Sequence, residues 1–137
     1  MRTYSKQTPP DVRIFRHGDE AILRFFYDLR EEASGFSYRE VSMTVPFEEG
    51  LSRRIEGNEE AWRDLAIARE REERAGEIRE ERNRLLQESD WTQMPDAPLC
   101  EEEKKAWAAY RKALRDLPES EGFPDEVSFP ELGGEGV

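Results

Sequence analysis

Residues 58–88 have the sequence NEEAWRDLAIAREREERAGEIREERNRLLQE, and this stretch organises the rest of the chain around it. Asn58 is a favourable helix cap, and no proline interrupts the residues that follow. Between Arg69 and Arg84, 12 of 16 residues are charged, six arginines and six glutamates. Opposite charges four residues apart, such as Glu80 and Arg84, stabilise a solvated helix by about 0.2–0.5 kcal/mol per pair. The stretch therefore predicts one long helix.

The apolar residues of this helix lie towards its two ends. Those near its start can pack on the preceding residues: Trp62, Leu65 and Ala66. Those nearer its end can pack on the following residues: Ala75, Ile78, Leu85 and Leu86. Residues 69–74 contain no apolar side chain, so they cannot form the buried face of an amphipathic helix. We expect this part of the helix to be solvated.

The residues before the helix are expected to form a small α+β module. Residues 1–10 are polar and end in two prolines, which predicts a loose or extended arm. Residues 12–15 are predicted to form a short strand that ends at a His17-Gly18 turn.

Residues 36–47 alternate apolar and polar side chains, which indicates a strand with one solvated face. The alternation shifts phase near Arg39-Glu40, as a β-bulge would require. Pro46 places this strand at a sheet edge or close to its own end.

Residues 19–34 fit two kinds of secondary structure. A helix is the first prediction, because Asp19 can cap it and Gly35 can end it. Its apolar residues recur at spacings of three and four: Ile22, Phe25, Phe26 and Leu29. A strand pair is the alternative, because Phe25-Phe26-Tyr27 has high strand propensity.

A second helix is predicted from about Glu101 to Leu117, where Pro118 ends it. Its apolar face follows helical spacing: Trp107, Tyr110, Leu114 and Leu117. We expect this face to meet the apolar end of the long helix in a helical hairpin. An extended tail follows, in which Phe123, Val127 and Phe129 can close one end of the hairpin and Gly133–Gly136 are expected to fray.

The expected fold is therefore α+β, with three segments. Residues 1–57 form a small strand and helix module, which is a candidate for docking on a client or particle. Residues 58–88 form the long charged helix. Residues 89–137 form the C-terminal helix and an extended tail, which pack back on the end of the long helix.

The charge of the chain argues against nucleic acid as a partner. Its 32 acidic and 21 basic residues give a net charge of −11, and an acidic surface repels phosphate. The imbalance is largest after residue 87, where 13 acidic residues accompany 5 basic ones. No segment has the length and apolarity of a membrane span or signal peptide, so we expect a cytoplasmic protein without a membrane partner.

The sequence contains no recognisable catalytic set, metal site or cofactor motif. His17 and Cys100 are the only histidine and cysteine, so neither a zinc cluster nor an internal disulfide is possible. Neither residue stands in a motif that names a nucleophile, and no glycine-rich phosphate loop follows a predicted strand. We expect a protein that is not an enzyme and uses no metal or cofactor.

Residues 82–99 (RNRLLQESDWTQMPDAPL) resemble the phage tail assembly chaperone family and the C-terminal part of tail fibre assembly proteins. The resemblance continues through residues 107–118 (WAAYRKALRDLP) and the Phe-Pro elements at 123–130, so it covers roughly residues 80–130. Cys100 stands where such sequences often have a threonine or serine cap, and Phe129 where tryptophan is common. These departures concern local capping and one aromatic contact.

This resemblance implies a chaperone that binds a phage tail or tail-fibre protein and assists its folding, oligomerisation or attachment. It would act in the cytoplasm of the host cell during assembly. A structural adaptor of the tail or baseplate, retained in the virion, is the alternative. Tryptophan, tyrosine and arginine concentrate binding energy at interfaces. The expected partner contacts are Trp91, Tyr110, Arg111, Arg115, Phe123 and Phe129. The oligomeric state stays open.

Overall fold

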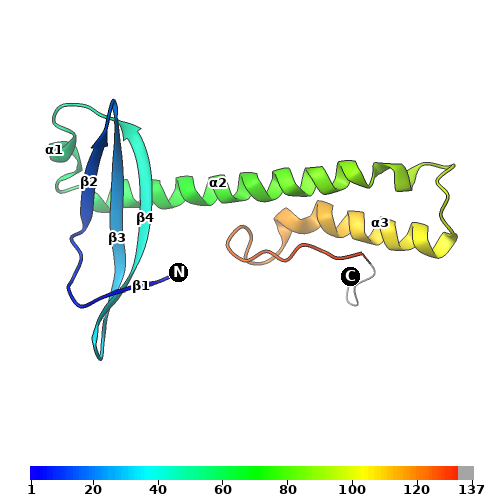
Figure 1. The fold of residues 1–137 in the computed structure, drawn as a ribbon, viewed down its shortest axis with the longest axis horizontal. Coiled ribbons are helices and arrows are strands. Elements are labelled where there is room, and N and C mark those ends of the chain that lie inside the picture. Colours follow the sequence, from blue (N-terminus) through cyan, green and yellow to red (C-terminus); the bar gives the residue numbers. More distant parts are fainter. Residues whose placement is uncertain (133–137) are drawn as a thin grey trace. The chain divides into compact units, whose positions relative to one another are not determined.

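The computed structural model describes residues 1–132 and confirms the α+β class (Figure 1). The predicted fraying of Gly133–Gly136 lies outside the described residues. The elements, in order, are β1 (Thr3–Ser5), β2 (Val12–His17), β3 (Glu20–Glu32), β4 (Gly35–Pro46), α1 (Leu51–Ile55), α2 (Glu59–Glu88), the 3-10 helix η1 (Asp90–Gln93), α3 (Glu101–Asp116) and the 3-10 helix η2 (Leu117–Glu119).

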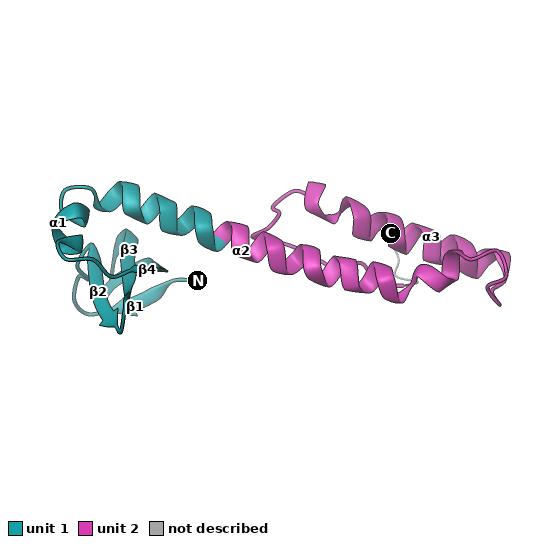
Figure 2. Ribbon diagram, turned by 90° about the horizontal axis from the view of Figure 1, so that it is seen from above, with its two compact units in different colours: residues 1–70 teal, residues 71–137 magenta. Residues whose placement is uncertain are grey.

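The chain forms two compact units, which Figure 2 distinguishes by colour. Unit 1 comprises residues 1–70 and unit 2 comprises residues 71–137, so the boundary falls within α2. The helix begins directly after Asn58, whose carbonyl accepts a hydrogen bond from the Trp62 N–H at 3.2 Å. The long charged helix is thus confirmed, and each unit contains one part of it.

Unit 1 is built on a four-stranded antiparallel sheet in the order β1-β4-β3-β2. The helix predicted at residues 19–34 is wrong, and strand is correct, although residues 20–32 form one strand and not a pair. The apolar spacing fits both structures, but Ala21, Leu23 and Phe25 are fully buried in strict alternation. Hydrogen bonding to β2 on one side and β4 on the other stabilises the strand. Leu29, an expected helix-face residue, is half exposed.

The β-bulge expected near Arg39-Glu40 of β4 lies beside these residues, in the neighbouring strand β3. Tyr27 pairs with Arg39 and Arg30 pairs with Ser37, so β3 contains one residue more than β4 between these pairs. Asp28 takes a positive φ of 52° there. The burial pattern of β4 shifts phase at the same point, since Tyr38 is buried and its neighbours Arg39 and Glu40 are exposed.

Part of the predicted N-terminal arm belongs to the sheet, because β1 pairs with residues 36–38 of β4. Arg2 anchors it: its guanidinium donates to the Asp28 carboxylate at 2.5 Å and to the Ser37 carbonyl at 2.9 Å. Gly35 is needed where β1 crosses, since a Cβ at this position would collide with the Ser5 carbonyl. Its role is therefore in the sheet and not at a helix end.

The core of unit 1 lies between one face of the sheet and two helical segments. Buried side chains from β3 and β4 line that face: Ala21, Leu23, Phe25, Val41, Met43 and Val45. They are covered by Leu51 and Ile55 of α1 and by Ala66 of α2, with Trp62 and Ile67 packed at the margin. Five residues are too few to show a helical period, and α1 was not predicted from the sequence.

Unit 2 is a helical hairpin followed by a returning tail. Both ribbon views show α3 running beside the last turns of α2 (Figures 1 and 2). Helix α3 has the predicted bounds to within one residue and is followed by η2, which contains Pro118. Its N-terminal cap position is Cys100, whose N–H donates to the Glu103 carboxylate at 2.9 Å. Leu114 and Leu117 are buried, as the apolar spacing predicted.

Candidate partner-binding surface

The hairpin turn of unit 2 is held together by Arg111 on α3. The last carbonyls of a helix have no partners within it, and a cation near them is also favoured by the helix dipole. Arg111 Nη1 donates to the Leu86 carbonyl at 2.6 Å and to Ser89 Oγ at 2.7 Å. Its Nη2 donates to the Asp90 carboxylate at 2.7 Å. This one side chain therefore joins α3 to the end of α2 and to the start of η1.

The turn itself is closed by short polar side chains that leave the helical path. Ser89 is buried, and its hydroxyl donates to the Leu85 carbonyl at 2.9 Å. Thr92 is buried as well, and its hydroxyl donates to the Ser89 carbonyl at 2.6 Å. Both carbonyls also accept a backbone N–H, so each hydroxyl adds a second hydrogen bond to its acceptor. The Ser89–Thr92 segment thus has a structural role that fixes the orientation of Trp91.

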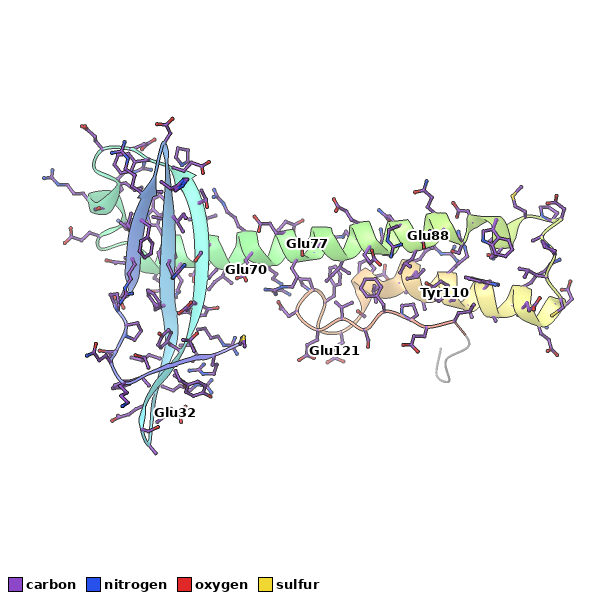
Figure 3. The ribbon with its side chains drawn as sticks, viewed as in Figure 1. Glu32, Glu70, Glu77, Glu88, Tyr110 and Glu121 are labelled. Carbon is purple, nitrogen blue, oxygen red and sulfur yellow. The ribbon has the colours of Figure 1, made fainter. Side chains whose placement is uncertain are left out.

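Three aromatic rings line the outside of this turn. Trp91 meets Trp107 edge-on at a ring separation of 6.2 Å, and Trp107 meets Tyr110 at 5.7 Å. Tyr110 lies on α3 (Figure 3). Trp107 and Tyr110 are half-buried, whereas Trp91 is 48% exposed and Met94, at the end of η1, is 56% exposed. We call Trp91, Met94, Trp107 and Tyr110 the hairpin-tip surface. Exposed aromatic and methionine side chains on an ordered backbone are typical of protein contact sites.

The structure brings three of the six expected partner contacts together: Trp91, Tyr110 and Arg111. The Arg111 side chain is only 11% exposed, and both of its Nη groups donate within the chain, while its Nε is buried without a hydrogen-bond partner among residues 1–132. The structure therefore gives it a positioning role for Trp91. Arg115 is exposed in the last turn of α3. Phe123 and Phe129 are half-buried in the tail. Whether any of these six residues contacts a partner stays a prediction.

The tail of unit 2 returns to α2 and is held there by arginines. Asp125 pairs with Arg74 and, at 3.8 Å, with Arg71, which also donates to the Phe123 carbonyl at 3.3 Å. Arg79 lies over the Phe123 ring at 5.4 Å from its centre. Of the stretch expected to be solvated, residues 69–74, residues 69–73 are exposed and Arg74 is half-buried, and both Arg71 and Arg74 contact the tail. Sequence reasoning missed these contacts because more than forty residues separate the partners.

Many charged side chains of the described residues form ion pairs. Glu81 accepts hydrogen bonds from Arg84, which lower the pKa of this carboxyl group and raise that of the arginine. Within residues 1–132, no group of three or more histidine, cysteine or acidic side chains could hold a metal ion. Among the helices of the same residues, none is long and apolar enough to cross a membrane.

Residues 75–132 match the family model described as phage tail assembly chaperone protein. The match confirms the resemblance of the C-terminal region and covers nearly all of the described part of unit 2. It supports a role in phage tail assembly. No curated protein and no solved structure matches the chain.

Proposed function

We propose that this protein is an assembly chaperone that binds a phage tail or tail-fibre protein and assists its folding, oligomerisation or attachment. It acts by binding and not by catalysis. It works in the cytoplasm of the host cell while tails are assembled, and any copies that stay with the client would enter the virion tail. Nucleic acid and membrane are not partners in this proposal.

The observation that carries the proposal is the location of the hairpin-tip surface within the family region. Residues 75–132 include every residue of this surface, and Trp91 exposes about half of its area at the tip. A large side chain fixed by Arg111 and the Ser89–Thr92 turn loses little conformational freedom on binding, which favours its use as an anchor. We therefore assign the client contact to Trp91 and Met94, with Tyr110 beside them.

The proposal is tested by co-expressing the protein with the tail-fibre protein of its own phage. Soluble, correctly oligomerised fibre is measured by gel filtration with wild-type protein, with Trp91→Ala and without the protein. We expect wild type to raise the yield severalfold and to co-elute with the client. Trp91→Ala should lose most of this effect while retaining its circular dichroism spectrum, because the side chain is half exposed.

Tyr4→Ala is the matched control, because Tyr4 is an aromatic residue with 71% exposure in unit 1, outside the family region. It should support assembly as wild type does. Equal fibre yield with and without the protein, and no complex on gel filtration, would contradict the chaperone proposal. Stoichiometric recovery of the protein in purified virions would then favour the structural adaptor.

A further inference from the structure

The face of the unit 1 sheet that is turned away from its helices has an arrangement of side chains that the proposed function does not use. Alternation along the strands places Ala21, Leu23 and Phe25 in the core and their neighbours Ile22, Arg24 and Phe26 on the opposite face. The register then extends this face across β2 and β4. We call it the free sheet face.

Two arginines lie directly opposite each other at the centre of the free sheet face. Arg13 of β2 pairs in register with Arg24 of β3, and the next residue across is Ser42 of β4. Like charges in directly opposed positions destabilise an antiparallel pair. Among the described ion pairs, none involves Arg13 or Arg24, although Glu40 is nearby, opposite Phe26. The fold thus keeps two positive charges adjacent without an internal counter-ion for either.

The two guanidinium groups lie over aromatic rings on each other's strand. Arg24 lies over Phe15 of β2 at 5.5 Å from the ring centre, and Arg13 lies over Phe26 of β3 at 5.6 Å. Stacking on a ring fixes the plane of a guanidinium but leaves its N–H donors free. Both arginines are exposed, and Phe15 is 45% exposed. Donors and apolar surface are therefore presented together.

We infer that the free sheet face binds a carboxylate-bearing segment of a protein partner. A carboxylate placed over the Arg13–Arg24 pair would accept charge-assisted hydrogen bonds and remove their mutual repulsion. Apolar side chains beside that carboxylate would cover Phe15 and Ile22 on one side and Phe26 on the other. The inference deepens the proposed function and rests on it for the kind of partner, namely the client protein.

Phosphate is the other anion that arginines bind, and aromatic residues on a sheet can stack with bases. The surroundings favour a carboxylate. Glu20 and Glu40 share the free sheet face, and the chain has a net charge of −11. A phosphate backbone carries one charge on every nucleotide, so these acidic residues of the free sheet face would repel it. A single carboxylate between apolar residues would not be repelled in this way.

The test uses the full-length protein and a rhodamine-labelled peptide, Ser-Leu-Glu-Leu-Glu-Ser, whose binding is followed by fluorescence anisotropy. The double variant Arg13→Gln, Arg24→Gln should weaken binding at least about tenfold, since two charge-assisted contacts are lost. Arg53→Gln is the matched control, because Arg53 is an exposed arginine on α1 and away from this face. It should bind within about twofold of wild type.

Two further probes distinguish a carboxylate ligand from a cationic peptide and from a nucleic acid. The peptide with lysine in place of glutamate should not bind, and neither should labelled oligothymidylate. Tighter binding of the oligonucleotide than of the glutamate peptide would overturn the inference in favour of a nucleic acid. Binding of the glutamate peptide that is absent, or equal in the double variant and wild type, would overturn it as well.

A melting curve provides a second readout. Because the arginine pair repels itself, the double variant should melt at the same temperature as wild type or higher. A fall of several degrees would show that the pair supports the fold and would contradict the inference. Loss of peptide binding in the double variant with unchanged fibre yield would overturn the assignment of this face to the client and leave the proposed function standing. If the wild-type protein binds the peptide but fibre yield is equal with and without the protein, the proposed function would be contradicted instead.

Discussion

Arg111 illustrates how one residue can organise a surface that it does not itself form. Its guanidinium contacts a helix end, a serine and an aspartate, all within 2.7 Å, and thereby fixes the turn that presents Trp91. A lysine could supply charge there but not the planar set of donors that reaches three acceptors in different directions. The proposed contact residue Trp91 is half exposed, whereas Arg111, which positions it, is nearly buried.

Replacing Arg111 by alanine should destabilise unit 2 by about 2–4 kcal/mol, because a nearly buried cation and its hydrogen bonds are removed together. The measurement is urea unfolding followed by tryptophan fluorescence, since Trp91 and Trp107 lie beside this turn. Arg115→Ala, which removes an exposed arginine one turn later, should shift the curve by less than about 0.5 kcal/mol. Equal effects of the two substitutions would contradict the positioning role of Arg111.

Asp28 should make the attachment of β1 sensitive to acid. The hydrogen bond from Arg2 lowers the pKa of this carboxyl group, and the charges of Arg30, Arg2 and Arg39 lower it further against the opposing effect of desolvation. A folded-state pKa below the unfolded value, about 3.9 for aspartate, stabilises the fold above that pH. The contribution is lost as the pH falls through the folded-state pKa.

We therefore expect the melting temperature of wild type to fall more steeply below about pH 4 than that of Asp28→Asn, which has no charge to lose. Glu31→Gln, an exposed carboxylate on the same strand, is the control and should keep the wild-type slope. Identical acid profiles for wild type and Asp28→Asn would show that the Arg2–Asp28 contact contributes no stability.

At the scale of elements, α2 combines a solvated surface with a few small residues that are covered. Ala66 is fully buried in unit 1 and Ala75 is buried in unit 2, while residues 68–73 between them are exposed. Ion pairs along the helix replace an apolar face in this stretch. Gly76 follows Ala75 and is the one glycine within the helix, where it weakens the helical backbone.

Gly76→Ala should stabilise the protein by about 0.5–1 kcal/mol, because alanine loses less backbone entropy in a helix and a Cβ at this position meets no atom within 4 Å. Urea unfolding monitored by helical circular dichroism measures the change. Ala68→Gly, at an exposed position in the same helix, should destabilise by a similar amount. A destabilising Gly76→Ala would show that the glycine is needed for close packing.

At the scale of the whole molecule, charge is distributed unevenly along the chain. Residues 88–137 combine 13 acidic with 5 basic residues, although the same region carries the exposed Trp91. Acidic side chains around an apolar anchor steer a basic partner towards it and keep the unbound protein soluble. The arginine pair of the free sheet face belongs to the other unit and provides a contact of opposite sign.

The association rate with the client should therefore fall as salt is raised from about 0.05 M to about 0.5 M, while the dissociation rate changes less. The client is immobilised on a surface. The association rate is measured while the protein is added, and the dissociation rate is measured after its addition is stopped. Converting the Glu101-Glu102-Glu103 run to glutamine should reduce the salt dependence, whereas the same change at Glu31 and Glu32 of unit 1 should not. An association rate that is independent of salt would contradict steering by the acidic region.

The sequence by itself determined those features that depend on neighbouring residues. The high charge and the absence of proline in α2, the apolar spacing and the terminating proline of α3, and the motif of residues 82–118 each involve residues a few positions apart. Local sequence is therefore sufficient to predict the two long helices, the α+β class and the family model that residues 75–132 match.

Only the tertiary structure decided what depends on distant partners. Residues 20–32 fit helix and strand spacing alike, and pairing with both β2 and β4 made them a strand. The inward turn of Arg111 and the contact of Asp125 with Arg71 join residues far apart in the chain. The opposition of Arg13 and Arg24, eleven positions apart, depends on the register in which β2 and β3 pair. The free energy of such contacts depends on which surfaces meet in the folded protein, and residues close together in the sequence do not specify this.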